Sequence, residues 1–223
     1  ATTAVGNIAI GRYSLADVTD GTANVAVGAY DGSAQPALRV NTGSRNVAVG
    51  SGCLSSNTTA NSNTAIGYNT MNSNTTGSGI AMGAYALDAQ TTGASNTAIG
   101  YQSLSELTTG NYNTAAGHEA GEFLTTGTEN AFLGFQAGTN ITTGGRNVCL
   151  GEGAGKAATT GSNNTYVGSD AGGALNTMTG NNNVSVGKAS GRGLTTGGQN
   201  TFVGEAAAVD CTTGNNNVCI GQD

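Results

Sequence analysis

Residues 96–112 read NTAIGYQSLSELTTGNY, and this stretch is one copy of a pattern that runs along the whole chain. Each copy opens with a pentapeptide of the form Asn-x-apolar-x-Gly, and most copies close with Thr-Thr-Gly. Most copies start 17 residues apart. So short and constant a period indicates one small supersecondary unit that is stacked on itself. The pentapeptide begins at Asn7, Asn24, Asn46, Asn63, Asn96, Asn113, Asn130, Asn147, Asn164, Asn183, Asn200 and Asn217, and also at Gly79, where Gly replaces the Asn.

The pentapeptide alternates and is rich in β-branched residues, which predicts a short strand at the start of each coil. The recurring Thr-Thr-Gly predicts a second short strand, and the Gly and Asn residues between the strands suit corners with positive φ. Stacked coils would pair each strand in parallel and in register with its copies, and the recurring Asn would form a hydrogen-bonded column of side chains. A helical fold is excluded, because units rich in Gly, Thr and Asn have poor helix propensity and show no helical stripe. The sequence therefore predicts an all-β fold, a parallel β-solenoid (β-roll) of about thirteen 17-residue coils.

A single repeat domain is predicted over residues 1–223, because the pattern continues from end to end. The coils start near residues 7, 24, 46, 63, 79, 96, 113, 130, 147, 164, 183, 200 and 217. Two stretches break the period: five extra residues enter within 31–42, around Pro36, the only proline, and two enter within 172–181. Solenoid insertions map to loops at one corner, frequently the binding face. Neutral decoration is the alternative for both loops.

The two sides of the predicted strand are both apolar. The second and fourth residues of the pentapeptide are expected to fill the interior, which leaves the third residue facing outward. This third column carries no charged residue, and it changes from alanines in the first half to bulkier residues in the second, as if neighbouring chains stood further apart there. A strand that is apolar on both faces is normally buried on both faces, so a parallel homotrimeric fibre is predicted. The alternative is a tolerated column of small residues on an exposed sheet. The residues predicted for the trimer interface are Ala65, Ala98, Ala115, Phe132, Cys149, Tyr166, Phe202 and Cys219.

Composition excludes several partners. The net charge is −6 and the seven basic residues are scattered, so nucleic acid binding is not expected. No apolar run reaches membrane-spanning length, so membrane insertion is not expected either. The four cysteines lack metal-type spacing and are predicted to be buried free thiols rather than a disulfide framework.

No chemistry of an enzyme is evident in the sequence. His118 is the only histidine, which excludes a histidine-based triad or a multi-histidine metal site within one chain, and an exposed corner residue is the better interpretation. Glu119 and Glu122 could form the carboxylate pair of a glycoside hydrolase, but a solvated edge is the simpler interpretation. We therefore expect no catalytic, cofactor-binding or metal residues, and no cofactor.

The phrases NTAIGYQSLSELTTGNYNTAAG and NTFVGEAAAVDCTTGNNNVCIG resemble repeats of bacteriophage tail-fibre and related host-recognition proteins. Such regions often precede a C-terminal chaperone that trimerises the fibre and is then cleaved off. The pattern is also similar to the Asn-Ser-x-Ala-Ile-Gly repeats in the heads of trimeric autotransporter adhesins. The resemblance implies a homotrimeric fibre on a virion or at an extracellular surface, whose partner is a host cell-surface glycan or another receptor.

The function expected from this resemblance is that of a phage tail-fibre segment, a rigid trimeric shaft or tip that contacts the host cell. The receptor-binding residues are unknown. Three alternatives stay open: a polysaccharide-degrading tailspike-like enzyme, a bacterial surface adhesin and an ice-binding solenoid. The ice-binding alternative is weakened because adjacent residues of Thr-Thr-Gly point to opposite sides, which leaves only one outward threonine column.

Overall fold

The computed structural model describes residues 4–30, 32, 35–39, 41–173 and 177–222. These residues form a parallel β-solenoid without a helix, as predicted, and the chain divides into two compact units, Ala1–Asn111 and Tyr112–Asp223. The prediction of one repeat domain over residues 1–223 remains a prediction. The first unit holds β1 (Ile8–Ile10), β2 (Val25–Val27), β3 (Val47–Val49), β4 (Thr64–Ile66), β5 (Gly79–Met82) and β6 (Asn96–Ile99), and the second holds β7 (Thr114–Ala116), β8 (Ala131–Leu133), β9 (Val148–Leu150), β10 (Thr165–Val167), β11 (Val184–Val186), β12 (Thr201–Val203) and β13 (Val218–Ile220).

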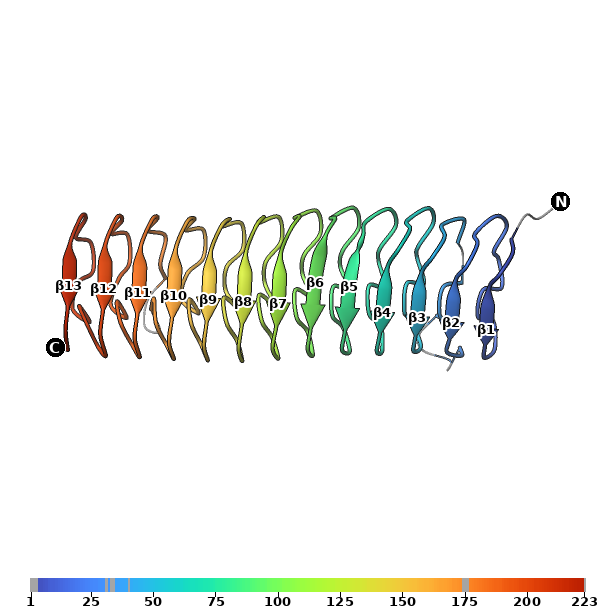
Figure 1. Ribbon diagram of the computed structural model, residues 1–223, viewed down its shortest axis with the longest axis horizontal. Coiled ribbons are helices and arrows are strands. Elements are labelled where there is room, and N and C mark those ends of the chain that lie inside the picture. Colours follow the sequence, from blue (N-terminus) through green and yellow to red (C-terminus); the bar gives the residue numbers. More distant parts are fainter. Residues whose placement is uncertain (1–3, 31, 33–34, 40, 174–176, 223) are drawn as a thin grey trace. The chain divides into compact units, whose positions relative to one another are not determined.

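Within each unit, every strand pairs in parallel with the next strand along the chain (Figure 1). The register places copies of the same repeat position opposite one another, so that Ala26 pairs with Ala48 and Tyr166 pairs with Cys149. The strands begin at or directly after the asparagine of each pentapeptide. The predicted strand and its predicted register are therefore confirmed.

The second strand predicted at Thr-Thr-Gly is not present among the described residues, where that side shows only an isolated bridge between Ala158 and Met178. The backbone N–H groups of Thr75, Thr76 and Gly77 all donate to one carbonyl, that of Thr91, at 3.1–3.2 Å. Consecutive donors that converge on one acceptor define a turn rather than a ladder. In such coils this wall is consequently held by a bend whose backbone N–H groups bond to the next coil along the chain.

The asparagine column is confirmed. The Asn46 side chain accepts a hydrogen bond from the Asn63 backbone N–H at 2.9 Å, and it donates from Nδ2 to the Ala60 carbonyl at 2.9 Å. The same two bonds recur in the second unit, where Asn147 donates from its N–H to Asn130 and from its Nδ2 to Gly161, both at 2.9 Å. Each of these side-chain amides thus donates to a carbonyl near the end of its own coil and accepts from the backbone N–H of the next column asparagine. Both bonds satisfy polar groups that would otherwise be costly to bury.

The coil corners follow the predicted chemistry only in part. The glycine that ends each strand has positive φ, for example 134° at Gly134. The residue before each column asparagine is also left-handed, but it is Gly or Asn in only four of the twelve copies and is otherwise a residue such as Arg45 (61°) or Tyr112 (60°). The glycine of Thr-Thr-Gly is needed for a different reason. A Cβ on Gly77 would lie 2.5 Å from a carbonyl oxygen of the next coil, so this position is fixed by close approach.

The interior of each coil is built around the third residue of the pentapeptide. This residue is buried in every strand from β2 to β12, whereas its two neighbours on the strand are half-buried or exposed. The predicted orientation of the strand is therefore wrong: the third column faces the core, and the second and fourth columns face outward. Since both phases of the alternation are apolar, the pentapeptide alone could not decide between them.

The interior is completed by the ninth residue of each repeat, which lies against the third. A Cβ on Gly138 would lie 2.6 Å from the Phe132 ring, and a Cβ on Gly155 would lie 2.5 Å from Cys149 Sγ. In the coils of β3 to β6 this ninth position holds a buried leucine or methionine instead, such as Leu54. The bulky third residues Phe132 and Tyr166 are thus accommodated inside their coils, beside glycines, and their size does not reflect the spacing of neighbouring chains.

Candidate functional site

The second and fourth residues of the strands form a surface that we call the outer strand face. It is built by the strand alternation, which turns the third residue inward and its two neighbours outward. The exposed fraction is 45% at Ile80 and 40% at Met82 in the first unit, and it is 53% at Leu133 and 42% at Val148 in the second. Each unit therefore presents large apolar side chains on the outside of its sheet.

No charged residue occurs on the outer strand face of the thirteen strands. Its polar members are five threonines, and every other position holds Ile, Val, Leu, Met or Ala. A contiguous apolar surface without charge is unusual for a protein exposed to water and marks an interaction site. The threonines are Thr64, Thr97, Thr114, Thr165 and Thr201.

The residues predicted for the trimer interface do not lie on this face. Their assignment depended on an outward-facing third column, and that column faces the core. Those that are buried cannot contact another chain while their own coil is folded, because the rest of the coil and the neighbouring coils enclose them. Ala65, Ala98, Ala115, Phe132, Cys149, Tyr166 and Phe202 are buried, and Cys219, on the final strand β13, is half-buried.

The single histidine occupies a corner, as predicted. The His118 side chain is 48% exposed, its Nδ1 lies 3.4 Å from Glu119 Oε1, and its ring centroid lies 5.5 Å from that of Phe135. Glu119 also accepts a hydrogen bond from Gln136 Nε2 at 2.6 Å. The Glu119 carboxylate therefore lies in a network of contacts at this corner. The residues that the structure describes hold no group of three His, Cys, Asp or Glu arranged to bind a metal ion.

The four cysteines are free thiols, as predicted, but only two of them are buried. Burial raises the pKa of the Cys149 thiol, and burial also raises the pKa of Cys53 in spite of hydrogen bonds that lower it. Cys211 and Cys219 are half-buried. The buried pair consequently acts as small apolar side chains and has little thiolate character.

Sequence reasoning missed a column of aromatic contacts in the first unit. The rings of Tyr68 and Tyr85 meet edge to face with centroids 5.5 Å apart, and those of Tyr85 and Tyr101 do so at 6.1 Å. The sequence placed Tyr68 and Tyr101 at the same corner, whereas Tyr85 is displaced by one residue and was not grouped with them. Such edge-to-face pairs stabilise adjacent coils.

No protein family, curated protein or solved structure shows a match to the chain. Among the residues that the structure describes, no helix has the length and apolar character needed to cross a membrane.

Proposed function

We propose that this chain is a structural fibre and adhesion protein, a segment of a phage tail fibre in which three parallel copies form a shaft or tip that contacts a glycan on the host-cell surface. One observation carries the proposal: the outer strand face is apolar and uncharged in both units. A parallel sheet that is apolar on both faces is normally covered on both. The interior of the coil covers one face, and the other requires a partner.

A second copy of the chain is the partner that best fits this face. The face repeats with each coil, so a contact made at one coil recurs at the next only if the partner has the same coil spacing. A parallel copy has that spacing and presents the same residue at the same level. In a symmetric assembly each charge near the axis would also face its own copy, and the outer strand face carries none.

The number of copies and the place on a virion come from the resemblance to tail-fibre repeats and adhesin heads. Three chains around one axis bring three outer strand faces together and remove them from water. Burying the exposed part of a side chain such as Ile80 contributes about 1 kcal/mol per chain, and this gain recurs along the stack.

Light scattering on the native protein at several concentrations tests the proposal. We expect a mass about three times that of the 21.7 kDa chain, independent of dilution. Ile80→Glu and Leu133→Glu place a charge on the outer strand face and should shift the protein to monomers at micromolar concentration. Thr92→Glu, at an exposed corner, is the matched control and should leave the trimer intact. A monomeric wild-type protein at all concentrations would contradict the proposal.

Ice binding is a second candidate, because the corrected strand orientation provides two outward columns separated by one inward residue. The strands Thr64–Ile66 and Thr165–Val167 each present a threonine beside an aliphatic residue. The second column nevertheless varies between Thr, Val, Ile and Ala, so the hydroxyl groups are irregularly spaced. Thermal hysteresis at millimolar protein tests this candidate, and its absence would remove it.

A further inference from the structure

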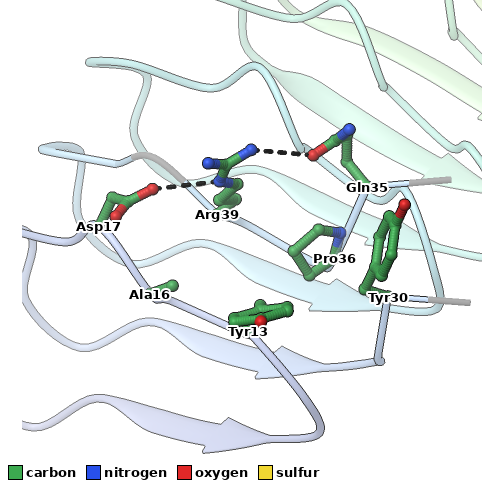
Figure 2. A pocket seen from close by; sticks show the side chains of 7 residues that line it. All are labelled: Tyr13, Ala16, Asp17, Tyr30, Gln35, Pro36 and Arg39. Atoms are coloured by element: carbon green, nitrogen blue, oxygen red, sulfur yellow. Dashed lines mark hydrogen bonds and ion pairs between the residues drawn. The ribbon is translucent and has the colours of Figure 1, made fainter. Parts of the chain in front are cut away.

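The insertion within residues 31–42 borders a cavity of about 410 Å³ in the first unit (Figure 2). The coil of β1 contributes Tyr13, Ala16 and Asp17 to its lining. Tyr30 and the insertion residues Gln35, Pro36 and Arg39 complete the lining. This volume lies within the range of about 300–1,000 Å³ that small-molecule sites occupy. The described insertion residues thus supply three of the seven side chains that line a hollow of this size.

The polar wall of the cavity is an ordered network of three side chains. Arg39 Nε donates to Asp17 Oδ2 at 3.1 Å, and Arg39 Nη1 donates to Gln35 Oε1 at 3.1 Å, as Figure 2 shows. The carboxylate and the guanidinium neutralise each other. Planar groups held in this way offer paired donors and acceptors at fixed positions, an arrangement suited to neighbouring hydroxyl groups.

The apolar wall consists of two tyrosine rings. Their centroids lie 6.4 Å apart with an interplanar angle of 65°, and the rings are accessible, since Tyr13 is 52% and Tyr30 is 39% exposed. The Arg12 guanidinium lies 4.7 Å from the Tyr13 ring centroid and donates to the Tyr13 hydroxyl at 3.1 Å, which fixes that ring. Accessible aromatic rings beside hydrogen-bonded polar groups characterise a binding surface.

We propose that this cavity binds an uncharged pyranose unit of a surface glycan. The C–H face of a pyranose ring packs against an aromatic ring, while its hydroxyl groups hydrogen-bond to the Asp17–Arg39–Gln35 network. A neutral sugar suits the polar wall because the ion pair between Asp17 and Arg39 leaves that wall without net charge. The inference names the receptor chemistry of the proposed adhesion function and rests on that function.

Saturation-transfer difference NMR on the wild-type protein tests the site with methyl glucopyranoside, methyl galactopyranoside and methyl mannopyranoside, and with sodium glucuronate as the charged probe. At least one neutral glycoside should receive saturation on its ring C–H protons and bind with a millimolar Kd. Tyr13→Ala and Tyr30→Ala should each weaken that binding at least tenfold. Tyr112→Ala removes a 64% exposed tyrosine outside the cavity and should leave it unchanged.

Three outcomes would overturn the inference: no neutral glycoside receives saturation, the two tyrosine variants bind like the wild type, or glucuronate alone binds. Both tyrosines are exposed, so their truncation leaves the core intact, and thermal melts of the variants check this. Asp17→Asn provides a second, conservative variant that breaks the ion pair without touching the aromatic wall, and it should weaken binding severalfold. A protein that forms trimers and adheres to host cells equally well with and without Tyr13 and Tyr30 would refute this site and leave the fibre function standing.

Discussion

The units Ala1–Asn111 and Tyr112–Asp223 fill the same interior space with opposite distributions of side-chain volume. In the first unit the third residue of the repeat is alanine and the ninth is large, as with Ala98 and Leu104. In the coils of β8, β9 and β10 in the second unit the third residue is larger and the ninth is glycine, as with Phe132 and Gly138. In these coils a gain of volume at one position is matched by a loss at the other, in keeping with the close packing of protein interiors, whereas Ala115 with Gly121 and Ser185 with Gly191 are small at both positions.

The backbone is the same in both solutions. The ninth residue is left-handed in each unit, with φ of 50° at Leu104 and 62° at Gly138. A leucine in this conformation costs roughly 1–2 kcal/mol relative to its preferred conformations, whereas a glycine adopts it freely. The first unit therefore accepts local strain in return for a buried leucine, and the second avoids the strain and places its apolar bulk on the strand.

The largest loss of stability is expected where a bulky third residue and a bulky ninth residue are combined in one coil. Gly138→Leu would bring a large side chain into the space of the Phe132 ring, because a Cβ there already lies 2.6 Å from that ring. Overpacking and left-handed strain together should lower the free energy of unfolding by about 3–5 kcal/mol. Urea denaturation measures this loss.

A compensating change sharpens the same test. Phe132→Ala alone should also cost about 3–5 kcal/mol through the cavity that it leaves. In the double variant the leucine occupies that cavity as it does in the first unit, so the two losses should be less than additive by at least 1 kcal/mol. Strict additivity would show that the third and ninth residues do not share one space.

The reverse change in the first unit should have a smaller and unusual effect. Leu104→Gly and Leu104→Ala both remove a fully buried side chain and should cost about 2–4 kcal/mol. Glycine should nevertheless be the better tolerated of the two, by about 1 kcal/mol, because φ at this position is 50°. Thermal melts compare the two variants, and a more stable alanine variant would contradict the strain assigned to Leu104.

The smallest effect is expected at the surface, where the comparison of interiors does not apply. Burial, and secondarily the nearby Glu106 carboxylate, raise the pKa of Asp88 from 3.8 to about 6. The folded state then binds the Asp88 proton more tightly than the unfolded state does. The contribution of Asp88 to stability is therefore fully present below about pH 4 and is lost as the pH rises through 6.

Asp88→Asn removes the free-energy cost of ionising this half-buried carboxyl group above pH 6. Allowing for solvent screening of a half-buried carboxyl, the variant should gain about 1 kcal/mol at pH 8 and nothing at pH 3. The melting temperature measured between these pH values tests the sign. A gain of equal size at low pH would show that packing, and not charge, is responsible.

Much of the fold could be predicted from the sequence, because a constant period and an alternating strand are visible in the residues themselves. The stacking, the register of the strands and the asparagine column all follow from them. The orientation of the strand could not be predicted from the pentapeptide, since Val25 and Ala26 are equally apolar and the alternation has two possible phases. The missing information lay six residues beyond the third residue, where a leucine such as Leu104 is exchanged for a glycine such as Gly138 in coils with a bulky third residue such as Phe132.

The outer strand face and the cavity beside Tyr13 and Tyr30 were less predictable from the sequence than the fold. The absence of charge along both strand faces indicated a surface that needs covering, but the inverted orientation placed it on the wrong column. The cavity beside Tyr13 and Tyr30 could be anticipated only as an irregularity in the period around Pro36. Its lining depends on how the insertion folds against the preceding coil, which no local pattern encodes.

The asparagine column also has a direction, and this bears on how the protein is made. Within each unit the side-chain oxygen of one column asparagine accepts the backbone N–H of the next, as between Asn46 and Asn63 or between Asn130 and Asn147. A finished coil therefore displays a ready acceptor for the coil that follows it in the chain. During translation, when the N-terminal part emerges first, each coil can serve as the template for its successor. Synthesis and folding can thus advance together, one repeat at a time.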